Sequence, residues 1–156
     1  MLKLIKKRGS RNSERGVTLP EFAIGGLVFM TAIFGVVELS RLFWTHNALT
    51  DAVRRGSRYA ATVSSSSASQ TAIKNMVVYG NTAGTGNPMV YGLTTSMVSL
   101  TYSTTYDTKN GSVMVRIPKG SYVFNLNIPL IASSVSMPEY KATVTAESAG
   151  RTPSDI

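Results

Sequence analysis

Side chains that commonly carry catalysis or bind metals are scarce in this sequence. Its 156 residues include no cysteine and a single histidine, His46. The lack of cysteine excludes disulfides, zinc ribbons, iron–sulfur clusters and thiol catalysis. One histidine disfavours a Ser-His-Asp site or a histidine-based metal site. The acidic residues of the C-terminal two thirds show no spacing that indicates paired carboxylates; they are Asp107, Glu139, Glu147 and Asp155. We therefore expect no metal, no cofactor and no enzymatic activity.

One carboxylate does lie where its chemistry matters. Glu21 interrupts residues 17–37, a run that is otherwise free of charge. Twenty-one helical residues span about 31 Å, close to the hydrocarbon core of about 30 Å, so we expect this run to cross a membrane. The alternative is a buried helix of a soluble domain. A carboxylate in a membrane helix costs roughly 2.5–3.5 kcal/mol at the bilayer centre and less near the edge, so Glu21 is a candidate functional residue. The alternative is that Glu21 merely reaches the cytoplasmic interface.

The net charge of +8 is concentrated at the N-terminus. Residues 1–16 carry six basic residues and one acidic residue, a net charge of +5, and the rest of the chain carries only +3. By the positive-inside rule this basic segment stays in the cytoplasm, which places the C-terminal part across the membrane. The remaining chain is close to balanced, so we expect no nucleic-acid partner.

The junction between the basic segment and the apolar run resembles a prepilin signal. It has a basic leader (1–16), Gly16 before Val17, and Glu21 five residues after the glycine. The resemblance implies that a prepilin peptidase cuts between Gly16 and Val17, leaving the apolar segment in the mature protein. It also implies that Glu21 neutralises the N-terminal amine of a neighbouring subunit. Cleavage would create such an amine at Val17, with an unperturbed pKa of about 7.7–8.0.

Residues 15–61 as a whole resemble the TadE-like family of minor pseudopilins from tight-adherence (Flp) pilus systems. The order and spacing of three blocks carry this resemblance: Arg15-Gly16 with Glu21-Phe22-Ala23, GVVELSRLF at 35–43, and NALTDAVRRGSRYAA at 47–61. One departure is Gly25-Gly26, where a proline is common in the family. The resemblance implies a role in pilus assembly with other pilin-like subunits, which contact the chain through its N-terminal helix. It places the chain in the bacterial inner membrane, or in the extracellular pilus.

Two other functions stay open from the sequence. One is an uncleaved single-pass anchor that displays a binding module, and the other is a pseudopilin of type II secretion. The C-terminal region is rich in Ser and Thr and poor in charge, which fits an exported, assembled protein better than a cytosolic one.

Residues 38–61 continue the apolar run as a predicted helical stalk. Leu42, Leu49, Val53 and Ala60 follow one another at spacings of seven, four and seven, which places them on one helix face. A helix from about 18 to 61 measures about 66 Å, so half of it would stand clear of the bilayer. We expect this half to pack on partner helices or on the protein's own head domain.

Charged residues of the stalk have the spacing of helix ion pairs. Glu38 precedes Arg41 by three residues, and Asp51 precedes Arg54 by three and Arg55 by four. The favoured interpretation of the arginines at 54, 55 and 58 is a solvated helix face, with a docking surface for another subunit as the alternative. His46 is expected to pack at the surface or at an interface rather than to bind a ligand.

The C-terminal part predicts a small antiparallel β domain at 96–148. A Ser/Gly-rich linker at 62–95, with a short helix over about 70–79, separates it from the stalk, and a flexible tail follows at 149–156. Alternation of apolar and polar residues predicts strands near 98–102, 113–117, 122–128 and 140–146, with an Asn110-Gly111 turn between the first two. The expected fold class is α+β, with a long membrane-spanning helix and a β-rich head.

Overall fold

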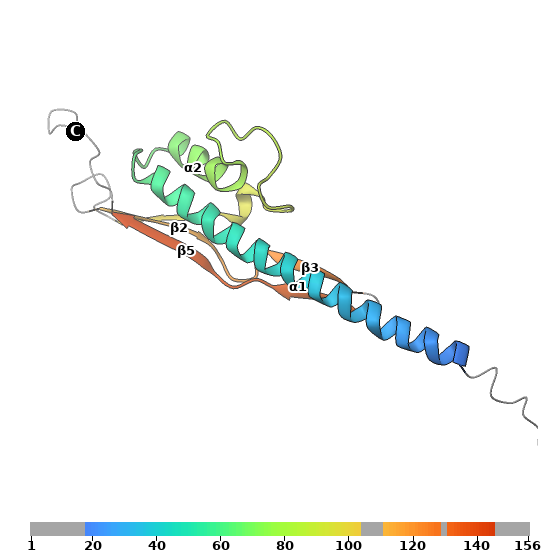
Figure 1. Cartoon of the computed structure of the whole chain (residues 1–156). Coiled ribbons are helices and arrows are strands. Elements are labelled where there is room, and N and C mark those ends of the chain that lie inside the picture. Colours follow the sequence, from blue (N-terminus) through green and yellow to red (C-terminus); the bar gives the residue numbers. More distant parts are fainter. Residues whose placement is uncertain (1–17, 104–110, 129–130, 146–156) are drawn as a thin grey trace, which may run out of the picture.

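One long helix, α1 (Thr18–Ala60), forms the axis of the molecule (Figure 1). The computed structural model describes residues 18–103, 111–128 and 131–145, so the leader, Gly16, Val17 and the tail lie outside the described residues. The 43 residues of α1 correspond to about 65 Å. Its N-terminal half projects alone, and its C-terminal half carries the head. The predicted helix from about 18 to 61 is therefore confirmed.

The head, which comprises the described residues after α1, packs its core against the apolar stripe of the stalk. Leu49, Val53 and Ala60 are fully or almost fully buried, and Leu42 packs partly buried against them. They meet buried side chains of the second helix and the sheet; among these are Ile73, Val77, Val78, Val113, Val115 and Ile117. The stalk therefore packs on the protein's own head, which was one of the two arrangements expected from the sequence.

The second helix, α2 (Ser67–Tyr79), lies against the C-terminal half of α1. It begins about three residues earlier than predicted because the Ser66 side chain accepts a hydrogen bond from the Ser69 N–H and so caps the helix. It ends at Gly80, which has a φ of 74° and donates its N–H to the Met76 carbonyl. Gly56 of α1 allows the two helices to approach closely, because a Cβ at this position would clash with the Val77 side chain.

A three-stranded antiparallel sheet of order β1-β2-β5 completes the core. After a short 3₁₀ helix (Thr95–Met97), its strands are β1 (Ser99–Tyr102), β2 (Ser112–Ile117) and β5 (Tyr140–Thr145). Along β2 the apolar residues Val113, Val115 and Ile117 are buried and alternate with partly buried ones, as the two-residue period predicts. Asn110 of the predicted turn lies outside the described residues.

A separate hairpin of β3 (Val123–Ile128) and β4 (Ile131–Ser136) lies along the middle of α1. The α+β class is confirmed, but the prediction of four strands was wrong, because β4 makes a fifth within the described residues. The sequence IASSVS has three serines and only two β-branched apolar residues, so its local signal is weak. Its strand conformation comes from pairing with β3, in a register that runs from Val123↔Ser136 to Ile128↔Ile131.

Candidate functional site

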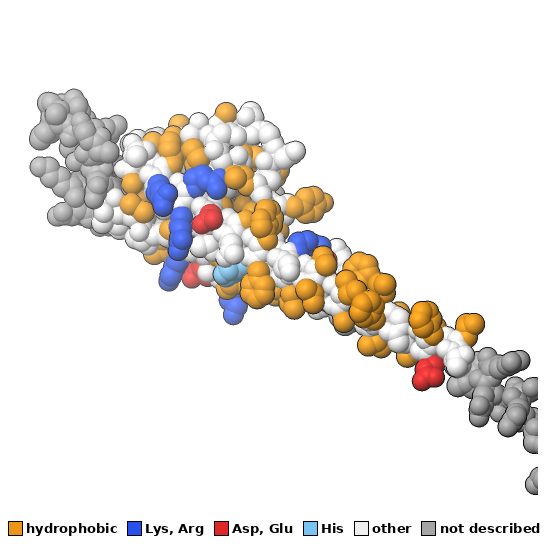
Figure 2. Space-filling model, viewed as in Figure 1, with side chains coloured by type: hydrophobic (Ala, Val, Ile, Leu, Met, Phe, Trp, Pro, Cys, Tyr) orange, Lys and Arg blue, Asp and Glu red, His pale blue; other side chains and the backbone are white. Residues whose placement is uncertain are grey.

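The projecting half of α1 has the properties of a membrane anchor. Within the described residues, α1 is the one helix that is long and apolar enough to cross a membrane, and only 6% of its most apolar 18-residue stretch is buried. A core helix of a soluble domain would be mostly buried, so that alternative does not fit. Large apolar side chains are exposed all along this half (Figure 2): Leu19, Phe22, Ile24, Leu27, Val28, Phe29, Met30, Ile33, Phe34, Val36 and Val37.

Glu21 lies in the first turn of this exposed segment. Its side chain is exposed, and a carboxylate at the N-terminal end of a helix is favoured by the helix dipole. The proposed cleavage site, Gly16 and Val17, lies outside the described residues. The structure therefore leaves Glu21 accessible to a neighbouring chain, and its pairing role stays a prediction.

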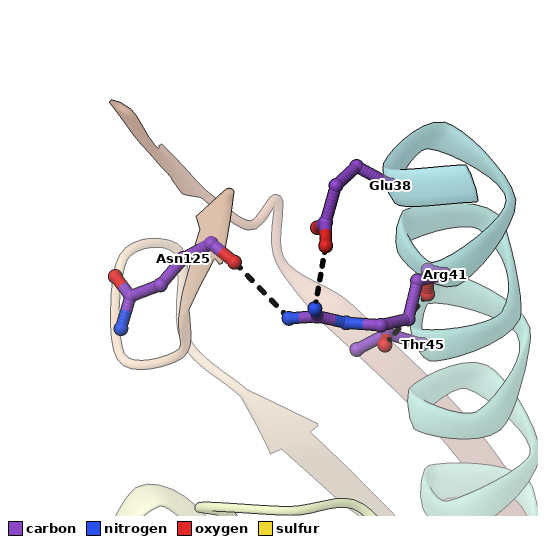
Figure 3. Close-up of polar contacts among 4 residues, drawn as sticks. All are labelled: Glu38, Arg41, Thr45 and Asn125. Carbon is purple, nitrogen blue, oxygen red and sulfur yellow. Dashed lines mark hydrogen bonds and ion pairs between the residues drawn. The ribbon is translucent and has the colours of Figure 1, made fainter. Parts of the chain in front are cut away.

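The predicted Glu38–Arg41 pair lies where the exposed half of α1 meets the head. The Arg41 Nη1 atom lies 2.7 Å from the Glu38 Oε1 atom, and Nη2 donates to the Asn125 carbonyl of β3 at 3.1 Å (Figure 3). The guanidinium also lies over the Phe124 ring, 4.7 Å from its centroid. We call these four residues the junction clamp, because they connect α1 to the β3–β4 hairpin.

The charges of the junction clamp differ in their exposure to solvent. The Glu38 residue is 5% exposed, whereas the Arg41 side chain is 45% exposed. The second carboxylate oxygen, Oε2, is buried and has no hydrogen-bond partner among the described residues. Removing one partner of a fully buried pair costs about 3–5 kcal/mol, and solvent around Arg41 reduces that value here. Arg41 is thus the main compensation for a desolvated negative charge.

The second predicted ion pair is not formed. Asp51 and Arg54 are both exposed, and neither forms an ion pair with any described residue. Arg55 instead directs its Nη1 atom to the Met89 sulfur in the loop after α2. An exposed pair of this spacing gains only about 0.2–0.5 kcal/mol, which the cost of ordering two long side chains can offset. Arg58 is exposed near the end of α1, where the helix dipole favours a positive charge.

His46 packs against the head, at the interface between α1 and β5. It is partly buried, and its Nδ1 atom lies 2.8 Å from the Tyr140 hydroxyl. The two rings are 5.2 Å apart between centroids. Burial raises the pKa of Tyr140 above its usual value. The histidine therefore has a structural contact, and the described residues contain no group of three or more His, Cys, Asp or Glu placed to bind a metal.

An open groove of about 760 Å³ lies beside the junction clamp. It is formed by α1, by the loop before the 3₁₀ helix, and by β3 and the residues before it; its lining includes Arg41, Trp44, Tyr91, Tyr122, Phe124 and Asn127. The Tyr122 hydroxyl donates to the Tyr91 carbonyl at 2.7 Å. Burial raises the pKa of Tyr122, and the nearby Arg41 charge partly opposes that shift.

Neither the groove nor the β3 half of the junction clamp was predicted from the sequence. Arg41 and Asn125 are 84 residues apart, and no motif links them. Phe124 and Asn125 do lie in a predicted strand. The alternation of apolar and polar residues in that strand does not show that they contact Arg41.

Comparison with known protein families confirms the resemblance of the N-terminal region. Residues 16–58 match the family model described as TadE-like protein. This range begins at the glycine of the proposed cleavage site and ends near the end of α1. No curated protein and no solved structure matches the chain.

Proposed function

We propose that this protein is a membrane-anchored, pilin-like subunit that takes part in assembly of a tight-adherence (Flp) pilus. The observation that carries the proposal is the TadE-like match over residues 16–58. Within this range, residues 18–58 belong to α1, whose apolar N-terminal half is unburied and whose C-terminal half supports a separate head. In this arrangement the apolar half of α1 contacts the membrane or neighbouring helices, and the head faces the exterior.

In this proposal a prepilin peptidase removes residues 1–16 and leaves Val17 as the new N-terminus. The basic leader holds the N-terminus in the cytoplasm until then, and the head lies across the bacterial inner membrane. The exposed apolar side chains of α1 then have two successive environments, the lipid before assembly and the helices of other pilin-like subunits during it. The chain contributes contacts rather than a reaction, whether it enters the filament or primes its assembly.

Glu21 supplies the charge for a specific contact in this assembly. Its carboxylate pairs with the free amine at Val17 of a neighbouring subunit, and both charges lie in a segment where an uncompensated charge is costly. Pairing therefore favours one axial position of one helix against the next. Glu21 is exposed on the isolated end of α1, which supports this role.

The pairing role predicts that Glu21→Ala is cleaved normally but assembles few or no pili. The variant would be expressed in cells that lack the native copy, and its N-terminus and the amount of sheared pili would be measured. Asp51→Ala is the matched control, because it removes an exposed carboxylate from the same helix that has no ion pair among the described residues. Piliation of Glu21→Ala at the level of this control would contradict the pairing role.

The two alternatives predict different results in the same cells. A pseudopilin of type II secretion would affect the export of secreted enzymes and leave Flp pili intact when its gene is deleted. An uncleaved anchor with a binding module would retain Met1 in the membrane fraction. The proposed function predicts loss of pili with normal enzyme export.

A further inference from the structure

Apolar exposure does not stop where the membrane-spanning segment ends. Beyond Val37, the side chains of Leu39, Phe43 and Trp44 remain exposed on α1. The head adds Tyr91 and Val123, and Figure 2 shows hydrophobic side chains continuing from the projecting helix onto the head. Trp44, Tyr91 and Val123 line the groove beside the junction clamp. We call these three residues the groove rim; they are 61%, 94% and 49% exposed.

The position of the groove rim along the helix matches the outer boundary of a bilayer. Leu19 and Trp44 are the first and last exposed large apolar residues of α1. The 26 residues that they bound correspond to about 39 Å of helix. A bilayer measures about 30 Å across its hydrocarbon core and about 40–45 Å with both headgroup layers. With Leu19 at the cytoplasmic edge of the hydrocarbon core, Trp44 reaches the headgroup layer on the far side of the bilayer.

The residue types of the groove also fit that layer. Trp and Tyr concentrate at membrane interfaces because one end of each side chain is apolar and the other forms hydrogen bonds. Arg41 lines the same groove, and its bonds to Glu38 and Asn125 use two of the five N–H donors of a guanidinium. Asn125 and Asn127 are exposed and add polar groups to the lining. A phospholipid headgroup offers the phosphate and the apolar boundary that this set of side chains matches.

We propose that the groove is a phospholipid site, in which the groove rim lies in the outer headgroup layer and Arg41 faces a lipid phosphate. The proposal rests on the membrane anchoring of the proposed function and adds a second contact, through the head. It fixes the head against the membrane surface before assembly. The occupant is a lipid of the same bilayer that α1 spans, because the groove continues the apolar surface of that helix. Between residues 22 and 44 the charged residues are Glu38 and Arg41, which pair with each other in the junction clamp.

Trp44 provides a direct test because it is the only tryptophan of the chain. The full-length protein would be reconstituted in phosphatidylcholine vesicles, with and without lipids brominated near the top of the acyl chains. We expect a blue-shifted Trp44 emission that is quenched by the brominated lipids and protected from acrylamide. The control is the double variant Trp44→Phe, Arg58→Trp. Position 58 lies on an exposed part of α1, 14 residues further along, or about 21 Å further from the membrane. The tryptophan introduced there should be open to acrylamide and insensitive to the bromines.

Each other result has a distinct meaning. If acrylamide quenches Trp44 as strongly as the control tryptophan, and the protein still resists carbonate extraction, the lipid site is overturned and the anchor stays intact. Protection from both quenchers would show that a second copy covers the groove, which also overturns the lipid proposal. Release of the protein by carbonate would overturn the anchor and the lipid site together.

Discussion

A buried carboxylate, Glu38, lies where the exposed half of α1 meets the head. Glu38 loses almost all of its solvent contact there, and Arg41 provides the opposite charge. Arg41 also donates to the Asn125 carbonyl and lies over Phe124. A single guanidinium therefore neutralises Glu38 and fastens the β3–β4 hairpin to α1.

Arg41→Ala should destabilise the protein more than Glu38→Gln does. The first change leaves a buried negative charge without its partner, whereas the second removes the charge and keeps the side-chain volume. Because Arg41 is partly exposed, we expect a loss of about 1–3 kcal/mol for Arg41→Ala. Thermal unfolding of the full chain in detergent micelles measures the difference. The control is Arg58→Ala, an exposed arginine of the same helix, expected within about 0.5 kcal/mol of the native protein. Equal stability of the Arg41 and Arg58 variants would show that the junction clamp is not structural.

The elements of the fold differ in how strongly local sequence determines them. The apolar stripe from Leu42 to Ala60 and the alternation in β2 predict their buried faces correctly, because each follows from the period of a single element. β4 depends on pairing with β3, and its serines carry little strand signal of their own. The Glu38–Arg41 pair is local and was predicted, whereas its contact with Asn125 depends on the tertiary position of the hairpin.

Gly56 illustrates a tertiary requirement that helix periodicity does not reveal. In the sequence it lies inside a helical pattern, where glycine costs about 1 kcal/mol relative to alanine. In the structure it is buried against α2, and an added Cβ would meet the Val77 side chain. The close packing of the two helices therefore accounts for a residue that the helix alone would disfavour.

Gly56→Ala should therefore destabilise the head, by about 1–3 kcal/mol, because the overpacked contact outweighs the gain in helix propensity. Gly25→Ala is the matched control: the same substitution in the same helix, at a position where an added Cβ meets nothing within 4 Å. We expect this control to unfold at or above the native temperature in the same detergent. If both variants are equally stable, Gly56 does not set the distance between α1 and α2.

The surface of the molecule comprises an apolar projection and a head whose exposed large apolar residues include Tyr91 and Val123. The leader holds most of the net charge, +5 of the total +8. In the proposed function this charge orients the chain and is then removed, so the mature protein carries about +3, spread over the stalk and head. The exposed apolar half of α1 requires lipid or other helices around it. In the proposed function, cleavage after Gly16 precedes assembly through this helix.

The intact mass of the protein isolated from native membranes shows whether the chain is cut after Gly16. We expect a chain that begins at Val17, and a Gly16→Ala variant that keeps residues 1–16. Gly9→Ala, the same substitution within the leader, should be cut normally. A native protein that retains Met1, or a Gly16→Ala variant that is cut as the native chain is, would contradict cleavage after Gly16 and the proposed pilin-like function with it.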